Sequence, residues 1–223
     1  IIQEIESAKL GLSNSGFYHF IAEDLSNLLL DDSYYPVLNY ENNSPLAVQV
    51  LGKIEAEVIY VPKWVYVKKL SFVSRGNDLG YLHPNGLKAL TEFANRYATD
   101  NKSGQNIYIS RIGTRRSIAG EEKIVEYLKD KGFRIVKAED FSFEEQISIF
   151  RNVNILIGLH GAGLTHGIWS NKTMLIELMP KNRINRCFEW QTLLSGKNYE
   201  RLLYEPDKPN IELIIEKLDS LIR

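Results

Sequence analysis

Residues Asn154-Ile-Leu-Ile-Gly-Leu-His-Gly-Ala-Gly-Leu-Thr-His166 join an apolar run to a glycine-rich loop. The run from Ile155 to Ile157 is typical of a buried strand in a parallel sheet. In the loop, Gly161 and Gly163 have no Cβ, so the backbone can approach a ligand closely. A helix that begins there would direct unpaired N–H groups and its positive dipole end toward an anion such as phosphate. The stretch predicts an α/β protein with an anion-binding turn.

Two familiar phosphate-binding motifs do not fit this loop. Its glycine spacing differs from that of the Rossmann dinucleotide fingerprint, and no Lys-Ser or Lys-Thr pair follows the glycines as it would in a P-loop. Taken alone, such a turn between a strand and a helix is as often a tight structural turn as a ligand site. The flanking sequence therefore has to decide between the two interpretations.

Strands and helices alternate regularly on both sides of the loop. The patterns predict strands at 106–110, 133–136, 155–158, 174–178 and 200–204, and helices at 120–131, 143–152, 185–194 and 211–222. Gly132 is placed to cap the first of these helices, and Ser142 with Glu145 has capping-box spacing. Such alternation predicts a parallel sheet covered by helices on both faces, with ligands at the carboxyl ends of its strands.

The first hundred residues also predict an α/β structure, with less regular spacing. We predict helices at 16–30 and 85–98, the second with Pro84 in its first turn, and short strands at 35–38, 46–50, 57–61 and 70–73. The small polar residues from Thr99 to Gln105 form the best domain boundary. The sequence therefore divides into a domain of residues 1–100 and a domain of residues 101–223.

The bulk composition excludes several classes of protein. The 223 residues carry a net charge of -1, with 44% hydrophobic and 25% charged residues, which is ordinary for a globular protein and gives no basic surplus for nucleic acid. The single cysteine, Cys187, allows no internal disulfide and no thiolate zinc cluster. We therefore expect a reducing compartment, the cytoplasm or its boundary at the inner face of the membrane. No apolar run reaches the ~20 residues of a membrane span. The chain begins at Ile1 without Met, which leaves open a longer protein of which it is a portion.

A series of short motifs surrounds the loop in a definite order. They are Ile107–Arg111, Arg115-Arg116, Glu121-Glu122, Gly132-Phe133, Phe141–Gln146, the loop itself and Leu175–Pro180. In order and spacing the series resembles glycosyltransferase family 61, which includes bacterial enzymes of capsular polysaccharide synthesis and eukaryotic relatives that add sugars to proteins or xylans. Upstream, Tyr18–Phe20 and Glu23–Leu25 are similar to the family's N-terminal His and acidic motif. The chain departs from the family at Gly120, where Asn is more frequent, and at His166, where Asn usually ends the loop motif.

The resemblance implies a fold, a reaction and a set of partners. It implies two Rossmann-like α/β domains facing across a cleft, the GT-B arrangement, with a nucleotide-sugar donor on the second domain and a glycan or glycoconjugate acceptor on the first. It also implies an inverting, single-displacement transfer. No Asp-x-Asp triplet is present to hold a divalent ion on a diphosphate. We therefore expect arginines and loop amides to stabilise the diphosphate, with no metal and no other cofactor.

Two arginines are candidates for binding the donor phosphates. Arg111 directly follows a predicted strand, where its guanidinium can reach a crevice and bind phosphate oxygens at two points. Arg116 lies in the same loop, as does Arg115, which is the weaker candidate. The alternative interpretation is a solvated loop, which is the usual place of an arginine pair.

The glycine-rich loop and the next strand supply the remaining donor candidates. His160 could donate a hydrogen bond to the diphosphate, or could be a hydrogen-bonded structural residue. The N–H groups that could complete the cradle are those of Gly161, Ala162, Gly163 and Leu164. Glu177 interrupts an apolar strand, where a carboxylate is costly unless it is bound. Its partner could be a ribose diol or, as a structural alternative, an arginine in a buried ion pair.

The catalytic base is expected in the first helix. His19 and Glu23 are four residues apart, so they lie on one helical face, where Glu23 can orient the imidazole or both can flank one acceptor hydroxyl. Asp24 lies on a different face. The resemblance implies that an acid of this motif is the base and leaves Glu23 and Asp24 as alternatives. An ordinary solvated acidic face is the structural alternative.

The resemblance implies an inverting glycosyltransferase, and two rival interpretations remain. A sugar-nucleotide epimerase of the same architecture would keep the donor site and need no acceptor groove. A non-catalytic binding module would keep the glycine-rich loop as structure and tolerate the loss of His19, Glu23 and Asp24. Donor turnover measured with and without a glycan acceptor separates the three.

Overall fold

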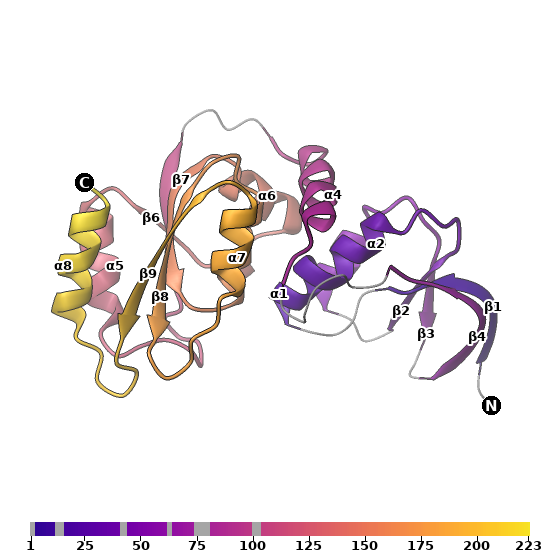
Figure 1. Ribbon diagram of the computed structural model, residues 1–223, viewed down its shortest axis with the longest axis horizontal. Coiled ribbons are helices and arrows are strands. Elements are labelled where there is room, and N and C mark those ends of the chain that lie inside the picture. Colours follow the sequence, from indigo (N-terminus) through magenta and orange to yellow (C-terminus); the bar gives the residue numbers. More distant parts are fainter. Residues whose placement is uncertain (1–2, 12–15, 41–43, 62–63, 74–80, 100–103) are drawn as a thin grey trace. The chain divides into compact units, whose positions relative to one another are not determined.

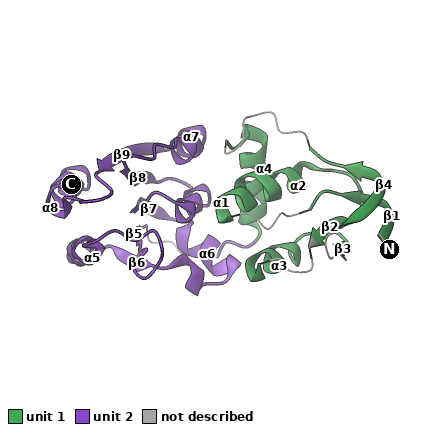
Figure 2. Cartoon of the chain, turned by 90° about the horizontal axis from the view of Figure 1, so that it is seen from below, with its two compact units in different colours: residues 1–96 green, residues 97–223 purple. Residues whose placement is uncertain are grey.

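The chain folds into two compact units, residues 1–96 and 97–223 (Figure 2). The computed structural model describes residues 3–11, 16–40, 44–61, 64–73, 81–99 and 104–223. Of the boundary expected at 99–105, residues 100–103 lie outside the described residues. The division between the units falls directly before this segment.

Unit 2, residues 97–223, is built on a five-stranded sheet with the order β6-β5-β7-β8-β9. Its strands are β5 (Gln105–Ile109), β6 (Arg134–Val136), β7 (Val153–Leu159), β8 (Met174–Pro180) and β9 (Asn198–Tyr204). All four neighbouring pairs are parallel. The prediction of a parallel sheet in this half is therefore confirmed.

Helices cover both faces of this sheet (Figure 1). The helices are α5 (Glu121–Asp130), α6 (Phe143–Phe150), α7 (Cys187–Leu194) and α8 (Ile211–Leu221), with two 3-10 helices, η2 (Ala138–Asp140) and η3 (Ala162–Ile168). α5 and α8 lie side by side over one face, while α6, η3 and α7 lie over the other. The core between α5, α8 and the sheet includes Tyr108, Ile157 and Ile176, each without exposed surface. Burial on both faces explains why the middle strands are continuous apolar runs.

Local signals in the sequence mark where helices of unit 2 begin and end. The Ser142 side chain accepts from the Glu145 N–H while the Glu145 carboxylate accepts from the Ser142 N–H, which completes the predicted capping box. Gly132 follows α5 with φ +80°, the left-handed conformation that a helix end commonly requires. Two short 3-10 helices, η2 and the helix η3 that follows the glycine-rich loop, are not among the predicted helices.

Unit 1, residues 1–96, contains a four-stranded sheet with the order β3-β2-β1-β4. Its strands are β1 (Gln3–Lys9), β2 (Val37–Tyr40), β3 (Val58–Val61) and β4 (Val65–Ser71), and the neighbouring pairs are parallel. Its helical segments are α1 (Phe17–His19), the π-helix η1 (Phe20–Leu25), α2 (Ser26–Leu30), α3 (Pro45–Leu51) and α4 (Pro84–Asn95). α4 packs against α2 and η1. Each unit is thus an α/β structure on a parallel sheet.

Four features of unit 1 differ from the expectations. The strand predicted at 46–50 is wrong: the segment is α3, because Ser44 caps its first turn and Pro45 occupies the first helical position. β1 was not anticipated, and β4 begins at Val65 instead of residue 70. The predicted helix at 16–30 is present but its middle is the π-helix η1, a rare geometry that is frequent at functional sites.

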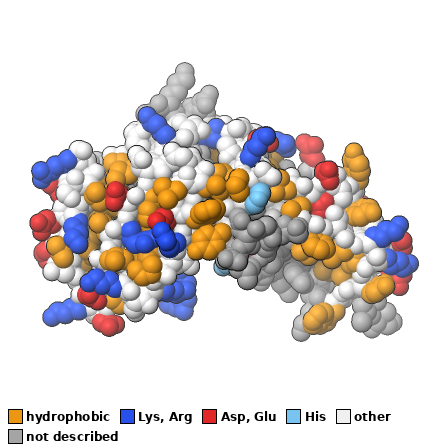
Figure 3. Space-filling model, viewed as in Figure 1, with side chains coloured by type: hydrophobic (Ala, Val, Ile, Leu, Met, Phe, Trp, Pro, Cys, Tyr) orange, Lys and Arg blue, Asp and Glu red, His pale blue; other side chains and the backbone are white. Residues whose placement is uncertain are grey.

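The surface is mixed in character. Acidic and basic side chains are interspersed over the visible face, in keeping with a net charge of -1 (Figure 3). Within the described residues, every helix is too short or too polar to cross a membrane.

Candidate functional site

The centre of the candidate site in unit 2 is the contact between Arg111 and Gly161. Arg111 follows β5 and Gly161 follows β7, and these strands are hydrogen-bonded neighbours. A Cβ added at Gly161 would lie 2.7 Å from Cζ and from both terminal nitrogens of Arg111. Gly161 also has φ +154°, a conformation that side-chain-bearing residues rarely adopt. Glycine is therefore required twice here, once by the backbone and once by the guanidinium that packs on it.

The charge around Arg111 favours an anionic ligand. Its side chain is partly buried, and among the residues that the structure describes it has no ion pair or hydrogen bond of its own. Burial, followed by the nearby positive charge of Arg116, lowers the pKa of Arg111, against the opposing effect of Glu121 and Glu139. A half-desolvated guanidinium beside a second one is costly, and a phosphate would relieve both penalties. Arg116 itself is exposed, as is Arg115.

A buried glutamate to which the sequence analysis assigned no role in the site holds this arginine loop. Glu121 has no exposed surface, and its Oε1 accepts from the Arg111 N–H at 2.6 Å, from Tyr108 Oη at 3.2 Å and from Ser110 Oγ at 3.3 Å. Within the described residues its Oε2 has no partner. Burial, then the charge of Glu121, raises the pKa of Tyr108 well above its usual value. The carboxylate thus fixes the backbone from which the Arg111 side chain departs.

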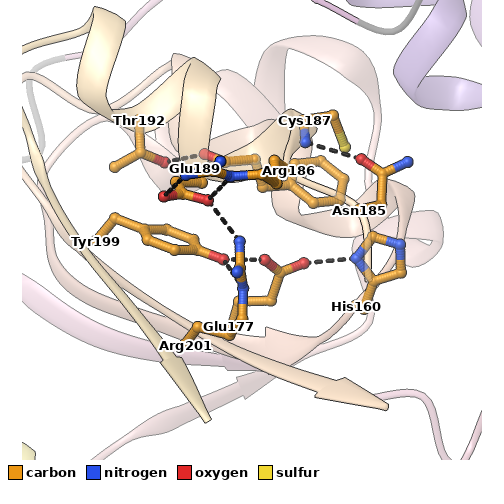
Figure 4. Close-up of polar contacts among 10 residues, drawn as sticks. His160, Glu177, Asn185, Arg186, Cys187, Glu189, Thr192, Tyr199 and Arg201 are labelled. Atoms are coloured by element: carbon orange, nitrogen blue, oxygen red, sulfur yellow. Dashed lines mark hydrogen bonds and ion pairs between the residues drawn. The ribbon is translucent and has the colours of Figure 1, made fainter. Parts of the chain in front are cut away.

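His160 lies in the same loop and is held by Glu177. The imidazole Nδ1 is 2.5 Å from Glu177 Oε1, and the Tyr199 hydroxyl donates to the other carboxylate oxygen (Figure 4). Glu177 has no exposed surface and the His160 side chain is 9% exposed. If Nδ1 carries the proton that it donates to Glu177, Nε2 points away from the carboxylate and is left for a ligand. Both oxygens of Glu177 are engaged, so direct contact with a ribose would require one of these bonds to be given up.

Tyr199 belongs to a longer polar chain that reaches α7. Arg201 Nε donates to the Tyr199 hydroxyl at 3.0 Å, and Arg201 Nη2 donates to Glu189 at 2.6 Å (Figure 4). Arg186 Nε and Nη2 bind the same carboxylate at 2.9 and 3.0 Å. The hydrogen bond from Arg186 is the largest cause of a Glu189 pKa of about 2, and Arg201 adds to it. The chain connects His160 on the loop after β7 with α7 through β8 and β9.

The first amides of η3 complete the predicted cradle in part. The N–H groups at the start of a helix lack intrahelical acceptors, and here these belong to Ala162 and Gly163. The Leu164 N–H already donates to Gly161 O at 2.9 Å, and the Leu164 side chain is buried. The predicted role of the Leu164 amide therefore does not fit this conformation, because its hydrogen is already used inside the turn.

His166, at the end of the glycine-rich stretch, is part of the core. It is 2% exposed, stacks on Phe150 with ring centroids 4.4 Å apart, and its Nδ1 accepts from Trp169 Nε1 at 3.2 Å. Burial lowers its pKa to about 3, so the ring is neutral at physiological pH. His166 therefore belongs to the core of unit 2 and contributes almost nothing to the surface of the loop.

In unit 1, the three predicted catalytic residues divide between two sides of η1. His19 Nδ1 is 2.8 Å from Glu23 Oε1, which confirms that the two share a helical face. His19 is half-exposed and the Glu23 side chain is 7% exposed. Asp24 lines a cavity of about 400 Å³ that neither His19 nor Glu23 lines. The structure thus separates a paired, largely buried acid from an acid at a cavity wall.

Glu121, Tyr199 and Arg201 are the site residues that the sequence interpretation missed. Tyr199 and Arg201 alternate on β9 and, in the sheet register, stand opposite Leu175 and Glu177 of β8. The sequence did contain a signal for them: two polar residues spaced two apart, on one face of a strand, next to a strand that carries one buried acid. Glu121 was named as part of the Glu121-Glu122 motif, but no role in the site was assigned to it.

Comparison with known proteins agrees with the motif order. Residues 17–182 match the family described as Glycosyltransferase 61. A stretch of 96 residues is 35% identical to the EGF domain-specific O-linked N-acetylglucosamine transferase of Drosophila melanogaster. That alignment covers 41% of this chain and 18% of the relative, so the match spans less than a fifth of the relative's length.

Proposed function

The chain belongs to glycosyltransferase family 61, and from this we infer that it transfers a sugar from a nucleotide-sugar donor to a hydroxyl of a glycan or glycoconjugate, with inversion at the anomeric carbon. The observation that carries the donor half of this proposal is the partly buried guanidinium of Arg111, packed on Gly161 beside the charge of Arg116. An anion placed there would be bound by charge and by hydrogen bonds at once.

We propose that the donor diphosphate lies at the carboxyl ends of β5 and β7. Arg111 and Arg116 would neutralise its charge, and His160 Nε2 with the Ala162 and Gly163 amides would donate hydrogen bonds. Charge builds up on the diphosphate as the sugar leaves, so donors already fixed in place stabilise the transition state more than the ground state. In this scheme Glu121 positions Arg111, and Glu177 positions His160.

The acceptor half of the reaction is assigned to unit 1. A hydroxyl becomes a sufficient nucleophile when a carboxylate or imidazole removes its proton during attack. We propose that His19, Glu23 and Asp24 supply this base, either as the His19–Glu23 pair or through Asp24 alone. The short His19–Glu23 contact supports the first route, and the position of Asp24 at a cavity wall supports the second.

The arrangement of the units and the independence from metal are also proposals. We propose that the two α/β units form a GT-B pair with donor and acceptor meeting across a cleft. We further propose that cations of the chain itself, above all Arg111, take the place of a divalent ion on the diphosphate. Transfer should then persist in excess EDTA. Complete loss with EDTA, restored by Mg²⁺ or Mn²⁺, would refute this part.

The experiment that tests the function follows nucleotide release from a panel of nucleotide sugars with and without glycan acceptors. A glycosyltransferase releases nucleotide and forms a product with inverted anomeric configuration only when acceptor is present. An epimerase converts the donor without acceptor, and a binding module does neither. Either of the last two results contradicts the proposed transfer.

A further inference from the structure

A cavity in unit 1 opens at the carboxyl ends of β1 and β4. Leu10 directly follows β1, and Phe72 directly follows β4; both line it. The lining also includes Asp24 of η1, Asn27 of α2 and Asp31, which directly follows α2. Its volume of about 400 Å³ falls in the usual range for small-molecule sites, roughly 300–1,000 Å³. The carboxyl ends of parallel strands are also where α/β sheets bind ligands.

The wall of the cavity combines an aromatic surface with acceptors of hydrogen bonds. Phe72 is 62% exposed and Leu10 is 57% exposed, although each lines a concave surface. The carboxylate residues Asp24 and Asp31 and the amide residue Asn27 line the same space. A carboxylate accepts hydrogen bonds and donates none, so the polar side suits a ligand rich in hydroxyl donors. An exposed ring suits a ligand with a flat face of C–H groups.

The Asp31 carboxylate is fixed in place before any ligand arrives. Its Oδ1 accepts from the Ser33 N–H at 3.0 Å and from Ser71 Oγ at 3.1 Å. Lys9 holds the same turn, with Nζ 3.3 Å from Asp31 O and 3.1 Å from Ser33 O. Burial alone would raise the pKa of Asp31, but these hydrogen bonds and the charge of Lys9 outweigh it and lower the pKa. Asp31 is therefore ionised at neutral pH, and it lines the cavity as a carboxylate.

We infer that this cavity binds an uncharged sugar ring of the acceptor, with Phe72 against the C–H face of the ring and Asp24, Asn27 and Asp31 around its hydroxyls. The inference rests on the proposed function, because it names the class of acceptor that such a transferase would use. Two carboxylates in one small cavity repel an anionic ligand. The cavity therefore selects neutral sugars and rejects uronates and sulfated or phosphorylated rings.

The test measures sugar binding directly, without donor and without turnover. Saturation-transfer NMR is run on the whole chain with methyl glycosides of xylose, glucose, galactose, mannose and N-acetylglucosamine, each neutral hexoside paired with its uronate where one exists. At least one neutral glycoside should receive saturation, strongest at its axial C–H protons, and its paired uronate should bind several-fold more weakly. Absence of saturation for all neutral glycosides, or equal binding of uronates, overturns the inference.

Two variants decide whether the signal comes from this cavity. Phe72→Ala should weaken binding of the glycoside about 2–10-fold, the range that follows from the loss of one aromatic contact. Tyr66→Ala is the matched control, because Tyr66 is an aromatic of β4 that is 59% exposed and does not line the cavity. It should bind the glycoside like the parent. Asn27→Ala provides a second variant on the polar wall, should Phe72→Ala fail to fold.

The outcome is separable from that of the proposed function. If glycosides bind in a Phe72-dependent way while no donor is turned over, the cavity is a sugar site and the transfer proposal fails. If transfer occurs and Phe72→Ala and Asn27→Ala leave both glycoside binding and the acceptor KM unchanged, the transfer proposal stands and this inference fails.

Discussion

The guanidinium of Arg111 packs against the α-carbon of Gly161, so closely that a Cβ there would be 2.7 Å from three of its atoms. Two residues fifty positions apart are brought together because β5 and β7 are adjacent and parallel. The contact fixes the position of a charge at the edge of the sheet where a ligand is expected.

Gly161→Ala tests whether this contact matters for binding. The variant should lose roughly 1–3 kcal/mol of stability from backbone strain and also displace Arg111, weakening UDP or GDP binding. Gly196→Ala is the control, because Gly196 has φ +67° with open space around its α-carbon. Thermal unfolding should show lower stability for both variants, whereas calorimetric titration should show weaker nucleotide binding for Gly161→Ala alone. Equal nucleotide affinity in the two variants would mean that the contact between Arg111 and Gly161 does not contribute to donor binding.

Tyr199→Phe tests the support of His160. Without the hydroxyl, one oxygen of the fully buried Glu177 loses its donor, which should cost about 1–3 kcal/mol in the free energy of unfolding. Tyr127→Phe is the matched control, because Asp219 keeps Lys131 and Arg223 as partners. Urea denaturation compares the two. A cost for Tyr199→Phe no larger than for Tyr127→Phe would mean that Glu177 does not depend on Tyr199.

His166 should make unit 2 sensitive to acid. Burial holds its folded-state pKa at about 3, while the unfolded chain has the ordinary value of 6.5. Between these values the unfolded state binds the extra proton, so this residue lowers stability as pH falls below about 6.5. The unfolding free energy of the parent minus that of His166→Phe should therefore decrease from pH 7 to pH 5. A difference independent of pH over that interval would contradict a buried neutral imidazole.

The base is tested by separate substitutions in α1 and η1. Glu23→Gln and Asp24→Asn should each keep donor binding, and one of them should lower the transfer rate by about 10²–10⁴-fold. If the His19–Glu23 pair is the base, the transfer rate of His19→Ala should fall together with that of Glu23→Gln. If Asp24 acts alone, His19→Ala and Glu23→Gln should both retain much of the parent rate. Single-turnover kinetics with bound donor give the rates. Parent-like transfer by all three variants would place the base elsewhere.

The sequence predicted unit 2 better than unit 1, for physical reasons. In unit 2 the middle strands β5, β7 and β8 are largely buried, so apolar runs, caps and turns all indicate the same element, as Ser142 and Gly132 do. In unit 1 the apolar residues of α3, among them Val48 and Val50, resemble a strand, and only Ser44 and Pro45 indicate a helix. The π-turn at Phe20–Leu25 has no sequence signature of its own.

The candidate site divides in the same way. The meeting of Arg111 with the glycine-rich loop followed from both lying after predicted strands of one parallel sheet. The partners of Glu177 could not be predicted in this way, because Tyr199 is brought next to Glu177 only by the register between β8 and β9. The role of Glu121 as a buried acceptor could not be predicted for a similar reason, since it depends on how α5 begins.

The most direct test of the donor site is calorimetric titration of the folded protein with UDP and GDP, before and after Arg111→Ala. Arg134→Ala serves as control, because Arg134 is an exposed arginine at the opposite, amino end of β6. The account predicts that the parent and Arg134→Ala bind one of the nucleotides alike and that Arg111→Ala binds it about 10–150-fold more weakly, equivalent to roughly 1.5–3 kcal/mol. Unchanged affinity in a folded Arg111→Ala protein, or no binding of either nucleotide by the parent, would contradict it.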